Sequence, residues 1–148
     1  MPLKTAFCFI LLMCVTGALA AQPVADMHLH YKWTQRELTS PEHALELLDQ
    51  NDIAMGVVIG TPAELALQLQ SLAPDRVIAM FGPYREGGDW HRWAYDTETV
   101  SRTRAALESG HYHAIGELHV IGGFAPKFAK ATVLRQLLGL GAEFDVPV

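Results

Sequence analysis

The stretch Asp26-Met27-His28-Leu29-His30 contains the residues best suited to chemistry, at the end of a short apolar run that begins at Val24. Side chains two apart on an extended strand share a face. We therefore expect His28 and His30 to project to one side, close enough to hold one metal ion between two imidazoles, with Asp26 one step further back. The alternative is a pair of surface histidines without a ligand.

A second pair, Glu117 and His119, lies at the end of a predicted strand over Ala114–Leu118. A carboxylate there can ligate or bridge metal ions, or act as a general base on a metal-bound water. We take Glu117 as the candidate catalytic residue, with His119 as a secondary candidate, and Gly116 leaves room for close backbone approach. Two alternatives remain for Glu117: it orients a histidine from outside the ligand set, or it is a solvated charge.

A third candidate is Arg85, in a segment that follows another predicted strand. Its guanidinium can bind a substrate carboxylate through two parallel hydrogen bonds, and we take Arg85 as the candidate substrate-binding residue. The alternative is an ordinary loop arginine. The loop over 82–93 also contains Trp90 and Trp93, which suit either a substrate wall or, more commonly, core packing.

Alternating strand-like and helix-like segments must position these residues. Continuous apolar runs predict buried parallel strands, and Ser40-Pro41 and Thr61-Pro62-Ala63-Glu64 predict helix starts, the latter as a capping box. The expected strands are 24–30, 54–59, 77–81 and 114–118, with a fifth beginning at 145–148, and the expected helices are 41–50, 62–72, 97–109 and 130–142.

This alternation predicts an α/β fold with a parallel sheet and helical crossovers. We favour the N-terminal half of a (β/α)8 TIM barrel, with four βα units and the start of a fifth strand, because barrel enzymes place their chemistry at the carboxyl ends of the strands. A doubly wound sheet is the rival architecture. Its usual glycine-rich turn after the first strand is absent, because His28-Leu29-His30-Tyr31 occupies that place.

Residues 1–20 have the pattern of a secretory signal peptide, with Lys4 before an apolar core and Ala18-Leu19-Ala20 as the cleavage site. We therefore expect a secreted or periplasmic domain over 21–148, without a stable membrane span after signal removal. Both cysteines lie inside the predicted signal, so the domain is not a disulfide scaffold. Loss of Lys4 changes the net charge from −5 to −6, which disfavours nucleic acid as a partner.

His28-Leu29-His30 on the first strand and Ile115-Gly116-Glu117 on the fourth resemble the amidohydrolase superfamily, in its amidohydrolase-related branch of TIM-barrel metal-dependent hydrolases and decarboxylases. The resemblance spans about 24–148 and only the N-terminal half of that family's barrel. It implies that His28 and His30 are metal ligands and that Glu117 is a site residue. It further implies a divalent metal, most simply zinc, whose bound water attacks an amide, ester or lactone carbonyl of a small molecule.

The family adds histidines from the fifth and sixth strands and an aspartate from the eighth, none of which is present here. We therefore expect a truncated chain with little activity as it stands, or one that needs another chain, such as a second copy, to complete it. A non-oxidative decarboxylase of the same family is one alternative. A non-catalytic periplasmic metal-binding or interaction module is another.

Overall fold

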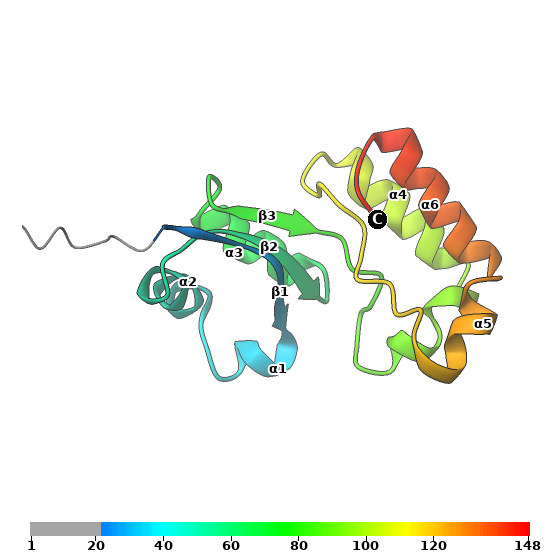
Figure 1. Cartoon of the computed structure of the whole chain (residues 1–148), viewed down its shortest axis with the longest axis horizontal. Coiled ribbons are helices and arrows are strands. Elements are labelled where there is room, and N and C mark those ends of the chain that lie inside the picture. The colour runs from blue at the N-terminus through cyan, green and yellow to red at the C-terminus, as the bar shows by residue number, and fades with distance from the viewer. Residues whose placement is uncertain (1–21) are drawn as a thin grey trace, which may run out of the picture.

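The computed structural model describes residues 22–148, and the predicted signal peptide lies outside them. The fold is mixed α/β, with three strands followed by a largely helical part (Figure 1). Its strands are β1 (Val24–Lys32), β2 (Ile53–Thr61) and β3 (Val77–Met80), and its helices are α1 (Trp33–Arg36), α2 (Pro41–Gln50), α3 (Glu64–Leu72), α4 (Glu98–Glu108), α5 (Ala125–Phe128) and α6 (Thr132–Phe144). Within the described residues, no helix combines the length and apolarity needed to cross a membrane.

The three strands form a parallel sheet in the order β1-β2-β3, as predicted. Leu29 pairs with Val58, and Val58 in turn pairs with Ala79. The second half of β2 is buried throughout, as expected for a central strand covered on both faces. The carboxyl ends of β1 and β2 therefore lie side by side, which is where His30 emerges.

The predicted fourth strand is wrong in extent. Within residues 114–118 a single parallel bridge joins Ile115 to Phe81, and it consists of Phe81 N–H to Ala114 O and Gly116 N–H to Phe81 O, each 2.9 Å. Gly116 has φ +145°, a backbone conformation that takes the chain out of the extended ladder directly after this bridge. The segment still lies beside β3, so it brings Glu117 to the same end of the sheet.

The predicted fifth strand is also wrong as a strand. Asp145 ends α6 in the left-handed conformation, and residues 146–148 form no ladder. One bond alone continues the order of the sheet: Ile115 N–H donates to Pro147 O at 2.9 Å. Pro147 has no N–H of its own to extend the ladder.

The two predicted helix starts differ in outcome. Ser40 is the N-cap of α2 and its Oγ accepts the N–H of His43 at 3.2 Å, which confirms the first. The Thr61–Glu64 capping box is wrong, since Thr61 is the last residue of β2 and Ala63 is the N-cap without a side-chain hydrogen bond. The strand runs two residues further than predicted, and the register of Thr61 with Lys32 on β1 keeps it extended.

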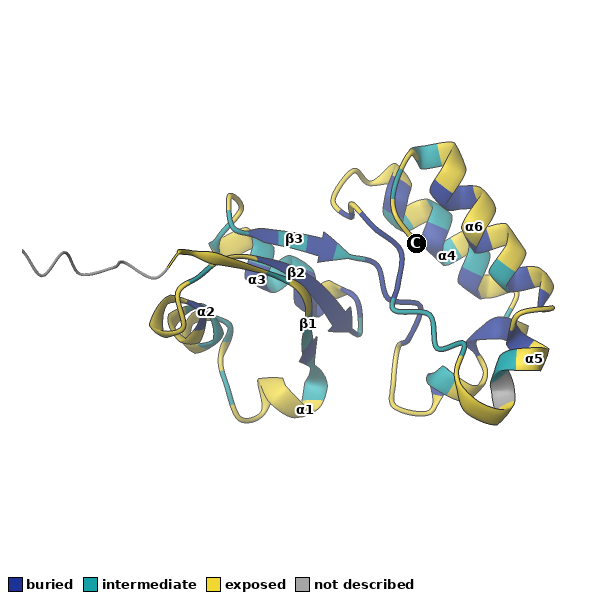
Figure 2. Ribbon diagram, in the orientation of Figure 1, coloured by how far each residue is buried: buried dark blue, intermediate teal, exposed yellow. Residues whose placement is uncertain are grey.

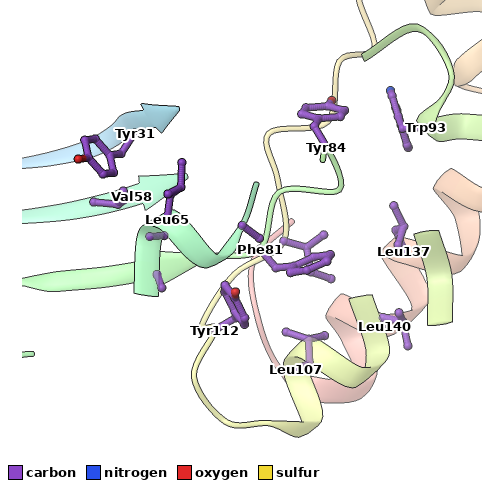
Figure 3. Packing of buried hydrophobic residues seen from close by; sticks show 14 of the residues in the cluster. Tyr31, Val58, Leu65, Phe81, Tyr84, Trp93, Leu107, Tyr112, Leu137 and Leu140 are labelled. Carbon is purple, nitrogen blue, oxygen red and sulfur yellow. The ribbon is translucent and has the colours of Figure 1, made fainter. Parts of the chain in front are cut away.

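The hydrophobic core runs from the sheet into the packed helices α4 and α6, and the outer faces of α2, α4 and α6 are exposed (Figure 2). Phe81 lies where the two parts meet, edge-on to Tyr112 with ring centroids 5.4 Å apart (Figure 3). Leu107 of α4 and Leu137 of α6 are buried in the helical part. Trp93 is 1% exposed, which confirms core packing for that residue.

Candidate metal centre

His28 and His30 share a face of β1, as their spacing predicts. Their Nε2 atoms are 3.0 Å apart, and the side chain of His28 is 56% exposed against 25% for His30. The register of β1 with β2 is irregular between Asp26 and Leu29, and Asp26 Oδ1 accepts the N–H of His28 at 2.9 Å. Asp26 therefore supports the backbone under His28. Irregular strand positions of this kind often re-aim a side chain beside a functional site.

Glu117 reaches the two histidines from the segment that follows β3 in the order of the sheet. Its Oε2 lies 3.5 Å from Nε2 of His28 and 3.3 Å from Nε2 of His30. Gly116 directly precedes Glu117 and has φ +145°, a conformation that residues with a side chain rarely adopt. Glycine at this position therefore allows the backbone turn that presents Glu117 to the two histidines. The predicted candidates His28, His30 and Glu117 are thus brought together, and the group could hold a metal ion.

The spacing of these donors fits a single small divalent ion. Ligands about 2.0–2.1 Å from a tetrahedral zinc are roughly 3.3 Å from one another. The three donor separations here are 3.0, 3.3 and 3.5 Å. Two imidazole nitrogens and one carboxylate oxygen are also the donor set that catalytic zinc sites use.

The electrostatics of His30 suit a ligand. Burial and then the positive charge of Lys32 lower the pKa of His30 below its ordinary 6.5, and together they outweigh the opposite effect of Glu117. A lowered pKa keeps the imidazole neutral at pH 7, which is the form that binds a metal. Its Nδ1 is buried, and no described residue is hydrogen-bonded to it.

His119, the secondary candidate, also contacts Glu117, with its Nε2 3.4 Å from the same Oε2. Its ring stacks on Tyr84, with centroids 5.0 Å apart and planes inclined by 11°, and its backbone N–H donates to the hydroxyl of Tyr84 at 2.8 Å. Burial raises the pKa of Tyr84 well above its ordinary value, so the hydroxyl keeps its proton. Trp90 approaches the ring of His119 edge-on, with centroids 6.0 Å apart.

A cavity of about 400 Å³ opens beside this cluster, a volume within the usual range for small-molecule sites. His30 and His119 line it, and His30 also belongs to the metal-binding group. The rest of the lining is largely aromatic and apolar, with one lysine and one glutamate: Lys32, Trp33, Thr61, Tyr84, Glu86, Gly87, Trp90 and Ile121. Trp90 both lines this cavity and packs against the hydrophobic core.

Arg85 is not brought to this cavity. Its Nε lies 3.2 Å from Asp89 Oδ2 and its Nη2 3.3 Å from Asp96 Oδ2. It lines a separate cavity of about 210 Å³ together with Arg92 and Arg102. The structure therefore places Arg85 in an ion-pair network, and the neighbouring Tyr84 in the wall of the cavity.

The remaining histidines lie away from the cluster. His43 is exposed on α2 and pairs with Glu46 at 2.9 Å, as expected for a solvent-facing residue. His111 and His113 are exposed before residue 114, at the opposite end of that segment from Glu117. His91 lies against Trp90, with ring centroids 3.5 Å apart.

The residues that sequence reasoning missed are those of the cavity wall, Tyr84, Trp33 and Lys32. Lys32 is the last residue of β1, Trp33 directly follows it, and Tyr84 directly precedes Arg85, so position along the chain was the available signal. Comparison with family models, curated proteins and solved structures finds no match to this chain.

Proposed function

We propose that this protein is an exported metal-dependent hydrolase of the amidohydrolase type, acting on an amide, ester or lactone carbonyl of a small molecule. One observation carries the proposal: His28, His30 and Glu117, from two segments far apart in the sequence, converge with the donor spacing of a single divalent ion. We propose zinc as that ion, because two imidazoles and a carboxylate form a common hydrolytic zinc site.

The order of the chain supports a barrel as the architecture. The sheet runs β1-β2-β3 without reversal, and the bridge at Ile115 and the bond to Pro147 continue in the same direction. A doubly wound sheet reverses its strand order at the switch point, where its ligand binds. The cluster instead joins the second half of β1 to the segment that follows β3 in the order of the sheet, and barrel enzymes have their sites at the carboxyl ends of the strands. We therefore propose that residues 24–148 correspond to the first four βα units of a (β/α)8 barrel and the approach to the fifth.

A divalent ion held by these residues would supply Lewis acidity, which activates water and polarises a carbonyl. His28 and His30 would hold the ion through their ring nitrogens. Glu117 would hold it through a carboxylate oxygen, and its side chain, 34% exposed, would be within reach of a water molecule at the site. The cavity beside His30 and His119 receives the substrate and shields one side of the site from water.

The first test is metal binding by the purified full chain. The protein is stripped with a chelator and titrated with Zn²⁺ against a chromophoric competitor, alongside His28→Ala, His30→Ala and the control His43→Ala. We expect one ion per chain, a loss of affinity of more than about 100-fold in the first two variants, and no change in the third. An ion at about 100 times its Kd should stabilise the fold by about 2.7 kcal/mol, which thermal unfolding can detect. No binding by the unaltered chain would contradict the proposal.

The second test is turnover of a panel of lactones, esters and amides by the zinc-loaded chain in ¹⁸O-labelled water. Label in the acid product supports hydrolysis. Release of CO₂ from an added carboxylic acid, with no ¹⁸O in the organic product, would identify a decarboxylase instead. Tight zinc binding with no turnover of any compound would favour a non-catalytic metal-binding module.

A further inference from the structure

His119, beside the metal-binding group, is held by contacts with two aromatic residues. Its ring stacks face to face on Tyr84, its backbone N–H is bonded to the Tyr84 hydroxyl, and Trp90 packs against it edge-on. Tyr84 is itself only 6% exposed, so the platform under the imidazole is part of the core. The position of this ring is therefore fixed from several directions.

The fixed ring directs one nitrogen at Glu117. Nε2 of His119 lies 3.4 Å from Oε2, a few tenths of an ångström beyond the usual hydrogen-bond range of about 2.7–3.2 Å. The side chain of Glu117 is 34% exposed, and among the described residues its carboxylate lies within 3.5 Å of three histidine nitrogens, those of His28, His30 and His119. A flexible carboxylate that must meet two ligands gains most from a neighbour that limits its rotamers.

We propose that His119 is a positioning residue, which donates a hydrogen bond from Nε2 to Glu117 and so aims that carboxylate at His28 and His30. This inference rests on the proposed metal site and assigns His119 a role outside the ligand set. The donor atoms of His28, His30 and Glu117 all lie within 4.8 Å of one another, and His119 is outside that group. Carboxylates that bind a metal are commonly hydrogen-bonded by residues outside the ligand set, and His119 would have this role.

The same ring also forms part of the cavity wall, next to His30. A molecule bound in the cavity can therefore contact the same ring that positions Glu117. The side chain of His119 would thus both position the carboxylate of Glu117 and contact a molecule in the cavity. The stack on Tyr84 holds its ring in place for both roles.

Two substitutions separate the hydrogen bond from the packing. His119→Gln keeps an N–H donor at similar reach and loses the aromatic stack, whereas His119→Phe keeps the stack and loses the donor. Each full-length variant is titrated with Co²⁺, whose visible spectrum reports ligand geometry, and is unfolded thermally without metal. His113→Gln, at an exposed position in the same segment, is the matched control.

We expect His119→Phe to lower Co²⁺ affinity about 10- to 100-fold with little change in Tm, and His119→Gln to stay within about threefold of the unaltered chain. Undiminished affinity in His119→Phe would overturn the proposal. Equal losses in both variants would also overturn it, in favour of packing if Tm falls with them, or of direct ligation if Tm holds and the spectrum changes. An unaltered chain that binds no Co²⁺ contradicts the proposed metal site itself, which is a distinct outcome.

Discussion

Oε2 of Glu117 lies 3.3 Å from Nε2 of His30, although the two residues come from segments far apart in the chain. In the order of the sheet, β2 and β3 lie between the two segments, and the chain leaves the ladder at Gly116, directly before Glu117. The contact joins a carboxylate to an imidazole whose pKa is lowered by burial and by Lys32. A neutral imidazole beside a carboxylate favours a shared cation over a simple salt bridge.

Glu117→Gln tests this relationship. The substitution keeps the size of the side chain and removes its charge, so we expect Zn²⁺ affinity to fall at least tenfold, about 1.4 kcal/mol or more, while the fold is retained. The matched control is Glu46→Gln, which alters an exposed carboxylate that also pairs with a histidine. Competition titration with a chromophoric chelator measures both. Equal Zn²⁺ affinity in the two variants would argue against Glu117 as a ligand.

Gly116→Ala tests the backbone that presents Glu117. Gly116 has φ +145°, and a Cβ there would lie 3.4 Å from the sulfur of Met80. The strain comes from the backbone conformation, and we expect it to lower the free energy of unfolding by on the order of 1–2 kcal/mol and to weaken Zn²⁺ binding. Gly123→Ala is the control, since a Cβ there meets nothing within 4 Å. Urea unfolding and zinc titration would both have to be unchanged in Gly116→Ala for this account to fail.

The first three strands and most helices could be predicted because their signals are local. The apolar run in β2 and the Ser40 cap of α2 each act within a few residues, and both are found. The failures arise where a distant part of the chain decides. Thr61 stays in β2 because Lys32 pairs with it, and residues 114–118 do not form a full strand because Gly116 turns the chain away.

The candidate site follows the same rule. The His28–His30 pair needed only the alternation of a strand, so its shared face could be predicted. The proposed positioning role of His119 could not be predicted, because its ring is held by Tyr84, which comes from another segment. Arg85 fits the same explanation, since its partner Asp89 begins a short 3₁₀ helix (Asp89–His91) and its partner Asp96 directly follows another (Trp93–Tyr95), and no sequence periodicity indicates either helix.

Leu137→Ala tests the packing of α6 against the rest of the core. Leu137 is fully buried, whereas its neighbour Leu138 is 51% exposed. Loss of a buried leucine removes its burial energy and leaves a cavity, so we expect the free energy of unfolding to fall by about 2–5 kcal/mol. Leu138→Ala should change it by less than about 0.5 kcal/mol. Urea unfolding followed by circular dichroism measures both, and similar values for the two variants would contradict this arrangement of α6.

Asp89→Asn tests the ion-pair network that holds Arg85. The side chain of Asp89 is 5% exposed, and it accepts hydrogen bonds from the backbone and Nε of Arg85 and from Arg92. Burial raises the pKa of Asp89, but the bonds and charge of these arginines outweigh it and bring the pKa below its ordinary 3.8. With the charge removed, we expect unfolding at pH 7 to become easier by about 1–3 kcal/mol.

The pH dependence of that loss has a definite sign. A carboxyl group whose pKa is lower in the folded than in the unfolded chain stabilises the fold above the unfolded value, and this contribution is lost as the pH falls through the folded value. The difference between Asp89→Asn and the unaltered chain should therefore be constant from pH 7 to about pH 5 and shrink below about pH 4. Urea midpoints at several pH values measure it, with the exposed Asp75→Asn as control. A difference that grows towards low pH would show that the arginines do not stabilise the charged form of Asp89.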